Sequence, residues 1–436
     1  MRQPDQRSER GGDGLPPAAV ATIAICTLAY LLDGVVHTVM GPLAPIVARS
    51  LHLSIAQLGP LFSANLIGQC IGLIAFPLAV GRIGHRGVVI GTLAGFGLFQ
   101  MLCGLAQSGE QLFWLRLVTG FFLGGTLPSC LAMIAEAAPP HRRGFIISLM
   151  FVGYGTGCAL AGIAALPGDW RMVMAGIGAV CLFAAAISWQ FLVEPRQADA
   201  ASSEPVPPPL RGALLLLAPP FGLGTVMLWL LFIAMLTISY CLSSWLPTML
   251  VQVGRSASFA SLSVTVFGLG GIVAGLVVGA LMDRFGQIRM LVGCFLGATV
   301  LFVWIGQVLA TATPVLLMTL LVADGFCALG AYAGINVVLA GFYPVHLRAL
   351  GIGVTKSVGR VGTVLAPILI GLALTHQVAE TTVTSLFAVP TALCVAALLV
   401  IANARRVTTR RENETGKRAG TEPARLQTAD RTGSGL

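Results

Sequence analysis

Apolar stretches of membrane-spanning length, separated by short polar breaks, run through most of this chain. An α-helix needs about 20 mostly apolar residues to cross a bilayer. A membrane β-barrel would instead show segments of about 10 residues that alternate between apolar and polar side chains, and no such alternation dominates. The pattern therefore predicts an all-α integral membrane protein with twelve transmembrane helices. These are expected at residues 19–41, 58–80, 87–107, 111–136, 145–166, 171–193, 223–250, 259–282, 288–310, 314–341, 350–374 and 380–403.

Three longer polar segments divide the chain. Residues 1–18 lead straight into a full-length span, which predicts a polar tail rather than a cleaved signal peptide. Residues 194–222 break the apolar pattern with Pro207-Pro208-Pro209 and predict a linker. Residues 404–436 are polar and arginine-rich, which predicts a disordered tail. Between these segments lie two predicted six-helix bundles, at 19–193 and 223–403.

The two predicted bundles share sequence. Pro-Pro-His-Arg-Arg at 139–143 returns as Pro-Val-His-Leu-Arg at 344–348, displaced by 205 residues, and the same displacement carries Thr119 onto Asp324. Upstream the displacement is 202, so one three-residue insertion or deletion accounts for all matches. Internal duplication in a membrane chain is typical of transporters, and it predicts two pseudo-symmetric halves. The upstream matches are Gly81-Arg82 with Asp283-Arg284, and Pro45 with Pro247.

Composition agrees with a membrane protein, and the charge distribution predicts its orientation. Hydrophobic residues make up 56% of the chain and charged residues 10%, with a mean hydropathy of +0.88. The net charge of +9 does not indicate nucleic-acid binding, because 20 of the 26 Lys and Arg residues fall on one side of the predicted helices. By the positive-inside rule that side is cytoplasmic, which places both termini and the linker inside the cell and the protein in the inner membrane.

The sequence offers no enzymatic chemistry. Most of the ten cysteines lie in predicted helices and none forms a C-x-x-C pair, so they are interpreted as small apolar packing residues. No metal-ligand cluster, nucleophile elbow or phosphate-binding loop is present, which predicts a protein without cofactor, bound metal or catalytic residues.

Charged residues inside the predicted spans are the candidates for function, because a charge in hydrocarbon costs several kcal/mol. Asp33 lies in the outer half of the first predicted helix, with His37 one turn further along the same face. Arg116 in the fourth helix lies at a similar depth. An Asp33–Arg116 ion pair is therefore expected, either as a static brace or as part of the mechanism.

The predicted spans of the second half also contain charged residues. Asp324 and Arg360 both fall near the midplane and are expected to pair, while Lys356 lies one turn before Arg360 on the same face. Lys356 either joins Arg360 in binding a carboxylate or extends to the cytoplasmic interface. A carboxylate between a cation and a cavity of changing hydration can bind and release a proton, so Asp33 is the first candidate for proton coupling and Asp324 the second.

Aromatic residues add candidate substrate contacts. Tyr240 and Tyr332 lie within predicted spans of the second half, where they either touch substrate or pack. Tyr240 and Trp245 also fall near the outer end of their helix, where aromatic side chains are enriched at the lipid interface.

Several motifs together resemble the major facilitator superfamily over residues 20–403. Gly279-x-x-x-Asp283-Arg284-x-Gly286 is similar to its loop signature, and Arg116-x-x-x-Gly120-x-x-x-Gly124 is similar to its proton-linked helix motif. The first copy of the loop signature keeps Arg82 but has Gly81 where an aspartate is expected. The resemblance implies two rocking bundles around a central site, with the conformational balance resting on Asp283. Further conformational loop residues are Arg143 and Arg348, from the duplicated Pro-x-His-x-Arg loops.

Finer features resemble the aromatic acid:proton symporter family within that superfamily. They are Leu32-Asp33-Gly34, Tyr240-x-x-x-x-Trp245-Leu246-Pro247 and Gly359-Arg360-x-Gly362. This family typically has a second aspartate three residues after the first, where the chain has Val36. The resemblance implies proton-coupled uptake of an aromatic carboxylate.

The expected function is therefore import of a small organic anion with protons by a carrier that works as a monomer. Import fits the energetics, because an anion entering against a negative-inside potential needs a co-moving cation. Arg360, Lys356 and Arg116 would attract the carboxylate, with His37, Tyr240 and Tyr332 beside them. A proton-antiport exporter of drugs or metabolites is the alternative, although Gly153-Tyr-Gly155-Thr-Gly157 lacks the proline usual in such exporters. A non-transporting sensor is a third, less favoured interpretation.

Overall fold

The computed structural model describes residues 16–139, 142–194, 216–219, 221–343 and 345–403, and within them the chain is helical without a strand. The termini and most of the linker, for which two tails and a connection were predicted, lie outside the described residues. The described helices are α1 (Pro17–Thr38), α2 (Met40–Ser50), α3 (Ile55–Cys103), α4 (Gly109–Ala137), α5 (Arg143–Ala164), α6 (Trp170–Phe191), α8 (Gly222–Gln252), α9 (Ala257–Phe285), α10 (Gln287–Val308), α11 (Pro314–Ala340), α12 (Val345–Thr375) and α13 (Glu380–Leu386).

The described residues contain eleven helical segments long and apolar enough to span a membrane. One of them, α3, is 49 residues long and is broken at Gly84, whose backbone has φ 71° and ψ 171°. This break gives α3 two membrane passages, so twelve passages result, as predicted. The break falls between the predicted spans 58–80 and 87–107, and a single non-helical glycine makes the turn. The last passage begins with α13 and runs on to Asn403.

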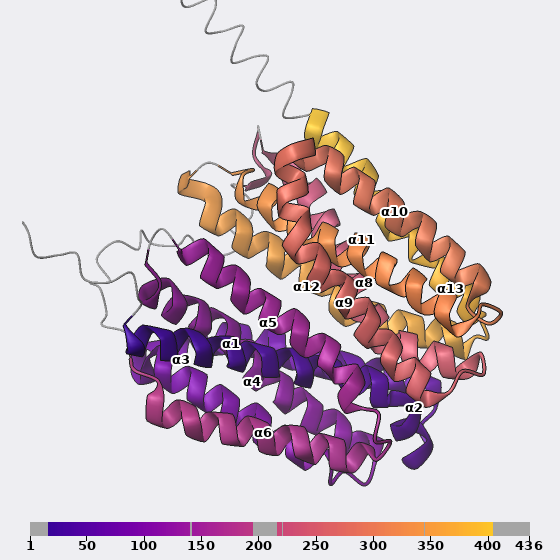
Figure 1. Ribbon diagram of the computed structural model, residues 1–436, viewed down its shortest axis with the longest axis horizontal. Helices are drawn as coiled ribbons and strands as arrows, with labels where there is room; N and C mark the ends of the chain where they lie inside the picture. Colours follow the sequence, from indigo (N-terminus) through magenta and orange to yellow (C-terminus); the bar gives the residue numbers. More distant parts are fainter. Residues whose placement is uncertain (1–15, 140–141, 195–215, 220, 344, 404–436) are drawn as a thin grey trace, which may run out of the picture.

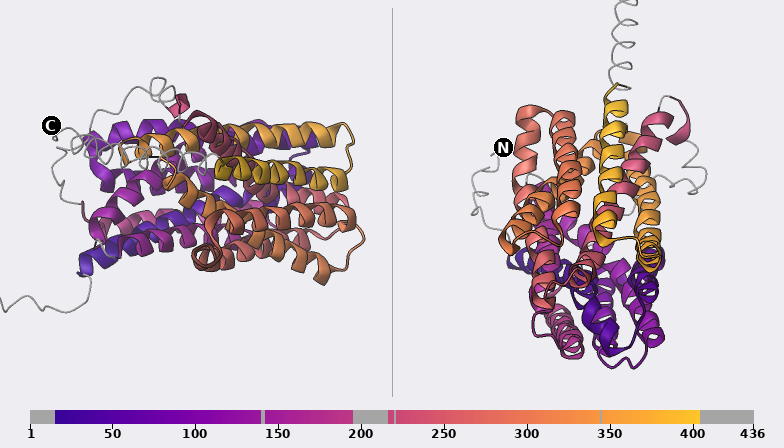
Figure 2. Two further views of the ribbon diagram at one scale, coloured as in Figure 1. Left: turned by 90° about the horizontal axis from the view of Figure 1, so that it is seen from above. Right: turned by 90° about the vertical axis from the view of Figure 1, so that its right-hand side faces the viewer.

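The helices form two halves that lie side by side (Figures 1 and 2). The first half contains α1 to α6, and the second contains α8 to α13. The halves meet where α3 packs on α12, α5 on α9, and α2 on α8. The face at which α1 begins and Gly84 and Gly286 lie is here called the terminal face. The opposite face, with the turns at 51–54, 165–169 and 253–256, is the distal face.

Short polar side chains start the helices at the distal face. The Ser108 hydroxyl accepts from the Gln111 backbone N–H at 3.2 Å, and the Asp169 carboxylate accepts from the Arg171 and Met172 N–H groups at 3.0 and 3.3 Å. Such caps satisfy backbone donors that a helix leaves unpaired in its first turn. These caps fix the residues at which α4 and α6 begin. Because the connections before them are short, each helix stays in register with the antiparallel helix that precedes it.

The duplication seen in the sequence is present in the packing. A Cβ atom on Gly120 of α4 would overlap the Asn65 carbonyl oxygen of α3. Displaced by 205 and 202 residues, Gly325 of α11 stands in the same relation to the Phe267 carbonyl oxygen of α9. Helix backbones approach this closely in membranes only where small residues allow it. The two halves are therefore built by the same helix contacts.

Two glycines of α6 provide a matched test of this packing. Gly178 lies against the Met101 nitrogen and the Gly97 oxygen of α3, whereas Gly176 is exposed and a Cβ there meets nothing within 4 Å. Gly178→Leu is expected to destabilise the fold by about 1–3 kcal/mol or more, because an inserted side chain forces backbones apart. Thermal unfolding of the purified protein would show a clearly lower midpoint for Gly178→Leu and little change for Gly176→Leu. Equal midpoints would contradict this account of the packing.

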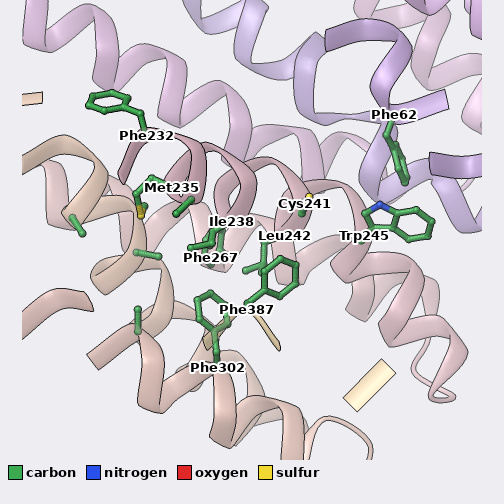
Figure 3. Packing of buried hydrophobic residues seen from close by; sticks show 14 of the residues in the cluster. Phe62, Phe232, Met235, Ile238, Cys241, Leu242, Trp245, Phe267, Phe302 and Phe387 are labelled. Atoms are coloured by element: carbon green, nitrogen blue, oxygen red, sulfur yellow. The ribbon is translucent and has the colours of Figure 1, made fainter. Parts of the chain in front are cut away.

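Apolar side chains of α8 pack toward both halves (Figure 3). Phe232, Met235 and Ile238 are fully buried within the second half. Trp245 is also fully buried, and its ring lies 5.2 Å from that of Phe62 in α3. The expectation that Trp245 lies at the lipid interface is therefore wrong, because α8 turns this residue toward the first half.

Hydrogen bonds between the halves lie toward the distal face or at mid-depth. Ser63 Oγ donates to the Val364 carbonyl at 2.7 Å, and Thr265 Oγ1 donates to the Ala159 carbonyl at 2.8 Å. Within the described residues, the hydrogen bonds that join the halves thus lie at mid-depth or toward the distal face.

Candidate substrate and proton site

Asp33 is a buried carboxylate near the middle of the molecule. Its side chain is 1% exposed, and its Oδ1 atom has no hydrogen-bond partner. No ion pair holds it within the part of the chain that the structure describes. The cation whose charge acts on it is Arg360, which comes from the other half. Asp33 therefore faces the contact between the halves.

The predicted ion pair between Asp33 and Arg116 is wrong. Arg116 is 2% exposed, and its Nη1 donates to the Val36 carbonyl and to Gln100 Oε1, each at 3.1 Å. Asp33 and Arg116 were expected at a similar depth in the membrane. A similar depth does not determine the direction in which each side chain points. Arg116 braces α1, α3 and α4 within the first half, and its contact with substrate stays a prediction.

Arg360 connects the halves at mid-depth. Its side chain is half-buried, and its Nη1 donates to Gln69 Oε1 of α3 at 2.7 Å. Lys356 is half-buried one turn away on α12, and the charges of the two side chains act on each other. Arg360, whose charge acts on Asp33, and Lys356 form no ion pair with a described carboxylate, which leaves positive charge available to an incoming anion.

The predicted pairing of Asp324 with Arg360 is also wrong. Asp324 is 0% exposed, and neither of its carboxylate oxygens has a hydrogen-bond partner among the described residues. Its electrostatic neighbour is Cys327 on the same helix. An ionised carboxylate buried without a partner costs several kcal/mol. Asp324 thus lies inside the second half, apart from the cations of α12.

Aromatic rings gather around these charges. The His37 ring lies 4.7 Å from that of Tyr240 across the contact between the halves, and Tyr154 stacks on Tyr30 at 4.7 Å. His37, Tyr154, Tyr240 and Tyr332 are only half-buried. They therefore keep surface that a bound molecule can touch. The central polar cluster is defined as Tyr30, Asp33, His37, Asn65, Gln69, Tyr154, Tyr240, Tyr332, Lys356 and Arg360.

Four members of the cluster were missed as site residues. Asn65 Nδ2 lies 3.4 Å from His37 Nδ1, and Gln69, one turn later on α3, holds Arg360. The signal for both was an i,i+4 pair of amides inside an apolar span. Tyr30 stands one turn before Asp33 on the same face of α1, and the charge of Arg360 acts on Tyr154. Polar residues at helical spacing would have identified Asn65, Gln69 and Tyr30, whereas Tyr154 has no such signal.

The predicted conformational loop residues lie at the terminal face. Arg82, Asp283, Arg284 and Arg143 are exposed there, and none forms an ion pair within the described residues. The Arg348 side chain lies outside the part of the chain that the structure describes. A latching role for Asp283 stays a prediction.

Within the described residues, no group of three or more His, Cys, Asp or Glu side chains has the arrangement of a metal site, and all ten cysteines are free. The central polar cluster thus combines a buried carboxylate, two cations and accessible aromatic rings. This set can bind an aromatic anion and can exchange a proton with it or with water.

Comparison with known proteins identifies the family. The family model of the Major Facilitator Superfamily matches residues 26–256 and 240–431. The chain therefore belongs to the major facilitator superfamily, as the sequence motifs indicated. It is a multi-pass membrane protein of a transporter family and not an enzyme.

The curated relatives are transporters. The chain is 32% identical to the 3-(3-hydroxy-phenyl)propionate transporter of Escherichia coli, over 80% of this chain and 86% of that protein. It is 29% identical to the gallate transporter of Pseudomonas putida, over 87% and 91%. It is 30% identical to the 4-hydroxybenzoate transporter PcaK of Pseudomonas putida, over 79% and 83%.

A solved structure shares the fold. A bacterial homologue of the human lysosomal transporter Spinster, in an inward-facing and occupied conformation, matches with a TM-score of 0.67 at 18% identity. The match covers 90% of this chain and 98% of that one. At this identity the likeness supports the twelve-helix fold alone.

The hydrogen bond between Gln69 and Arg360 gives a prediction for the site. Gln69→Ala removes an acceptor from a charged donor, which is worth about 1.5–3 kcal/mol, so Arg360 loses its fixed position. We expect the KM for the transported anion to rise about tenfold, with a smaller change in turnover. Gln69→Glu keeps an acceptor but neutralises Arg360, so its KM should rise at least as much. Initial uptake rates against substrate concentration check both, and an unchanged KM in Gln69→Ala would show that the bond does not position Arg360.

Proposed function

We propose that this protein is a proton-coupled symporter that imports an aromatic carboxylate by alternating access. The observation that carries the proposal is the central polar cluster. In it, an unpaired buried carboxylate, Asp33, lies within the field of a cation, Arg360, at the contact between two pseudo-symmetric halves. The runner-up carboxylate, Asp324, lies inside one half.

The substrate carboxylate is assigned to Arg360, supported by Lys356. A guanidinium binds a carboxylate with two parallel hydrogen bonds, which fixes both affinity and orientation. The ring of the substrate would then lie among the half-buried rings of His37, Tyr240 and Tyr332. Offset or edge-to-face contacts between such rings are favourable. The relatives named for gallate, 4-hydroxybenzoate and 3-(3-hydroxy-phenyl)propionate support an aromatic acid as substrate.

The proton is assigned to Asp33. An ionised Asp33 competes with the substrate carboxylate for Arg360, whereas a protonated Asp33 leaves Arg360 free to bind the anion. Proton binding therefore favours substrate binding, and by linkage substrate favours the proton. This reciprocity is what symport requires.

Alternating access is supported by where the halves touch. The distal hydrogen bonds of Ser63 and Thr265 would hold the distal side closed, with the terminal side facing the cytoplasm. Rocking of bundle 19–193 against bundle 223–403 would break these bonds and close the terminal face through the loops of Arg82, Arg143, Asp283, Arg284 and Arg348. The arginine-rich tails support an inner-membrane protein with cytoplasmic termini. The proposed carrier works as a monomer, because its two halves enclose one central site.

Uptake into proteoliposomes tests the proposal. Radiolabelled benzoates, phenylpropanoates and aliphatic acids would be offered with an inward proton gradient. We expect aromatic carboxylates to accumulate above equilibrium, and their accumulation to collapse when a protonophore is added. Expulsion of cationic dyes without carboxylate uptake would instead support the antiport exporter. Binding of an aromatic acid without any flux would support a sensor.

A further inference from the structure

A cavity that shares no lining residue with the central polar cluster lies toward the terminal face of the second half. It occupies about 560 Å³ between the C-terminal end of α9, the first two turns of α10 and the middle of α11. These three helices lie side by side in the second half (Figure 1). Two arginines, Arg284 and Arg289, stand at this cavity, and the remaining lining is mostly apolar. The apolar and small lining residues are Phe285, Met290, Gly293, Cys294, Phe326 and Cys327.

The two arginines are charged groups without a partner. Both are exposed, and neither forms a hydrogen bond or ion pair with another described residue. The Arg284 guanidinium lies over the Phe285 ring at 5.5 Å. The site thus offers two positive charges beside an apolar hollow. This combination fits an anion attached to an apolar body.

The cavity continues into a longer one that is suited to a hydrocarbon chain. A hollow of about 920 Å³ follows α11 from Pro314 to Cys327, with Phe259 of α9 on its other side. The two hollows share Phe326 and Cys327. Together they form a groove that begins at the arginines and runs along the membrane-spanning part of α11 toward the distal face. A free phosphate or other soluble anion would leave the apolar part of this groove unused.

The duplication supplies an independent argument for the anion. In the first half, the Glu194 carboxylate accepts from the His85 and Arg86 backbone N–H groups at 2.8 and 2.9 Å, where the chain resumes its helix after Gly84. A displacement of 202 residues carries Gly84 onto Gly286, which also has a positive φ of 88°. At this equivalent position, the first turn of α10 has no side-chain cap and no acidic residue. Among the described residues, the first turn of α10 thus lacks the carboxylate that Glu194 supplies in the first half.

We propose that the groove between α9, α10 and α11 binds an anionic phospholipid. Its phosphate lies between Arg284, Arg289 and the start of α10, and one acyl chain follows α11. Basic pockets between transmembrane helices on the cytoplasmic side are suited to acidic headgroups, because each arginine near the surface attracts the anionic lipid. The lipid completes in the second half the anion site that Glu194 fills in the first.

Native mass spectrometry of the delipidated full-length protein, titrated with dioleoyl phosphatidylglycerol or dioleoyl phosphatidylcholine, tests this. We expect one phosphatidylglycerol to bind well above phosphatidylcholine. The double variant R284Q/R289Q should bind it roughly 30-fold more weakly. Arg82→Gln, at the equivalent position of the first half, should bind it as the wild type does. Equal binding by R284Q/R289Q and the wild type, or equal binding of the two lipids, would overturn the proposal.

Two further experiments distinguish lipid binding in the groove from attraction by diffuse surface charge. A Cβ on Gly293 meets nothing within 4 Å, so Gly293→Leu fills the cavity while both arginines remain. This variant should also lose the lipid, and unchanged binding would show that the groove is not occupied. Glycerol phosphate, which carries the headgroup charge without acyl chains, should not displace the lipid at equal concentration. Displacement would assign the site to a soluble anion and overturn the lipid proposal.

Discussion

Asp33→Asn is expected to abolish accumulation of substrate driven by a pH gradient while leaving substrate exchange in place. Asparagine keeps the size of the side chain but cannot bind and release a proton. Asp33 is buried without an ion-pair partner among the described residues and the charge of Arg360 acts on it, so the variant loses the carboxylate to which the proton is assigned. In proteoliposomes, accumulation under an inward proton gradient should fall at least about tenfold, to simple equilibration. Counterflow of labelled against unlabelled substrate should stay near the wild-type rate.

Asp324→Asn is the matched control for this result. Both carboxylates are buried and unpaired, but Asp324 lies inside the second half and away from Arg360. Asp324→Asn should therefore retain gradient-driven accumulation. Loss of accumulation in Asp324→Asn, with retention in Asp33→Asn, would move the coupling site to α11.

Arg360→Gln is expected to cause the largest loss of substrate affinity. A charge-assisted pair between a guanidinium and a carboxylate is worth about 2–3 kcal/mol, so the KM should rise roughly 30-fold or more. Arg360→Lys keeps the positive charge but loses the paired donors of the guanidinium. Its KM should therefore lie between the values for the wild type and for Arg360→Gln. Initial uptake rates at a fixed pH gradient, with protein amounts matched, measure the effect.

Lys356→Gln provides the comparison within the same helix. Lys356 lies one turn from Arg360, has no hydrogen bond to a described residue and contributes mainly through its charge. Its removal should raise the KM only a few-fold. A larger effect for Lys356→Gln than for Arg360→Gln would exchange their roles in binding the carboxylate.

The fold could be predicted from the sequence, because the length of the apolar runs and the internal duplication determine it. Twelve apolar runs predicted twelve passages, and the displacements of 202 and 205 residues predicted equivalent helix contacts. Gly120 and Gly325 make such a pair, each against a carbonyl oxygen of the neighbouring helix. What the apolar pattern could not show was that Gly84 alone would replace the loop between two passages.

The site was accessible only in part. Depth along a helix follows from residue number, so Asp33, Arg116 and Arg360 were correctly placed inside the span. The side-chain directions depend on helix rotation, which apolar residues on every face leave undetermined. For this reason the pairs of Asp33 with Arg116 and of Asp324 with Arg360 were wrong, and Gln69 was missed as the partner of Arg360.

Differences between the two halves identify the site better than their similarities. Asp33 corresponds to Met235, which is fully buried in the apolar core. Arg360 corresponds to Gly155, and Gln69 to Gly271. Each polar member of these pairs lies in the central polar cluster, while its counterpart is small or apolar. The repeats thus supply the scaffold, and their departures from symmetry supply the chemistry.

Proton movement driven by substrate tests the central claim most directly. Proteoliposomes containing a pH-sensitive dye, with equal pH inside and outside, would receive an aromatic carboxylate on the outside. The account predicts acidification of the lumen that follows the substrate gradient and is absent in Asp33→Asn. Substrate entry with no change in luminal pH, or with alkalinisation, would contradict proton-coupled symport.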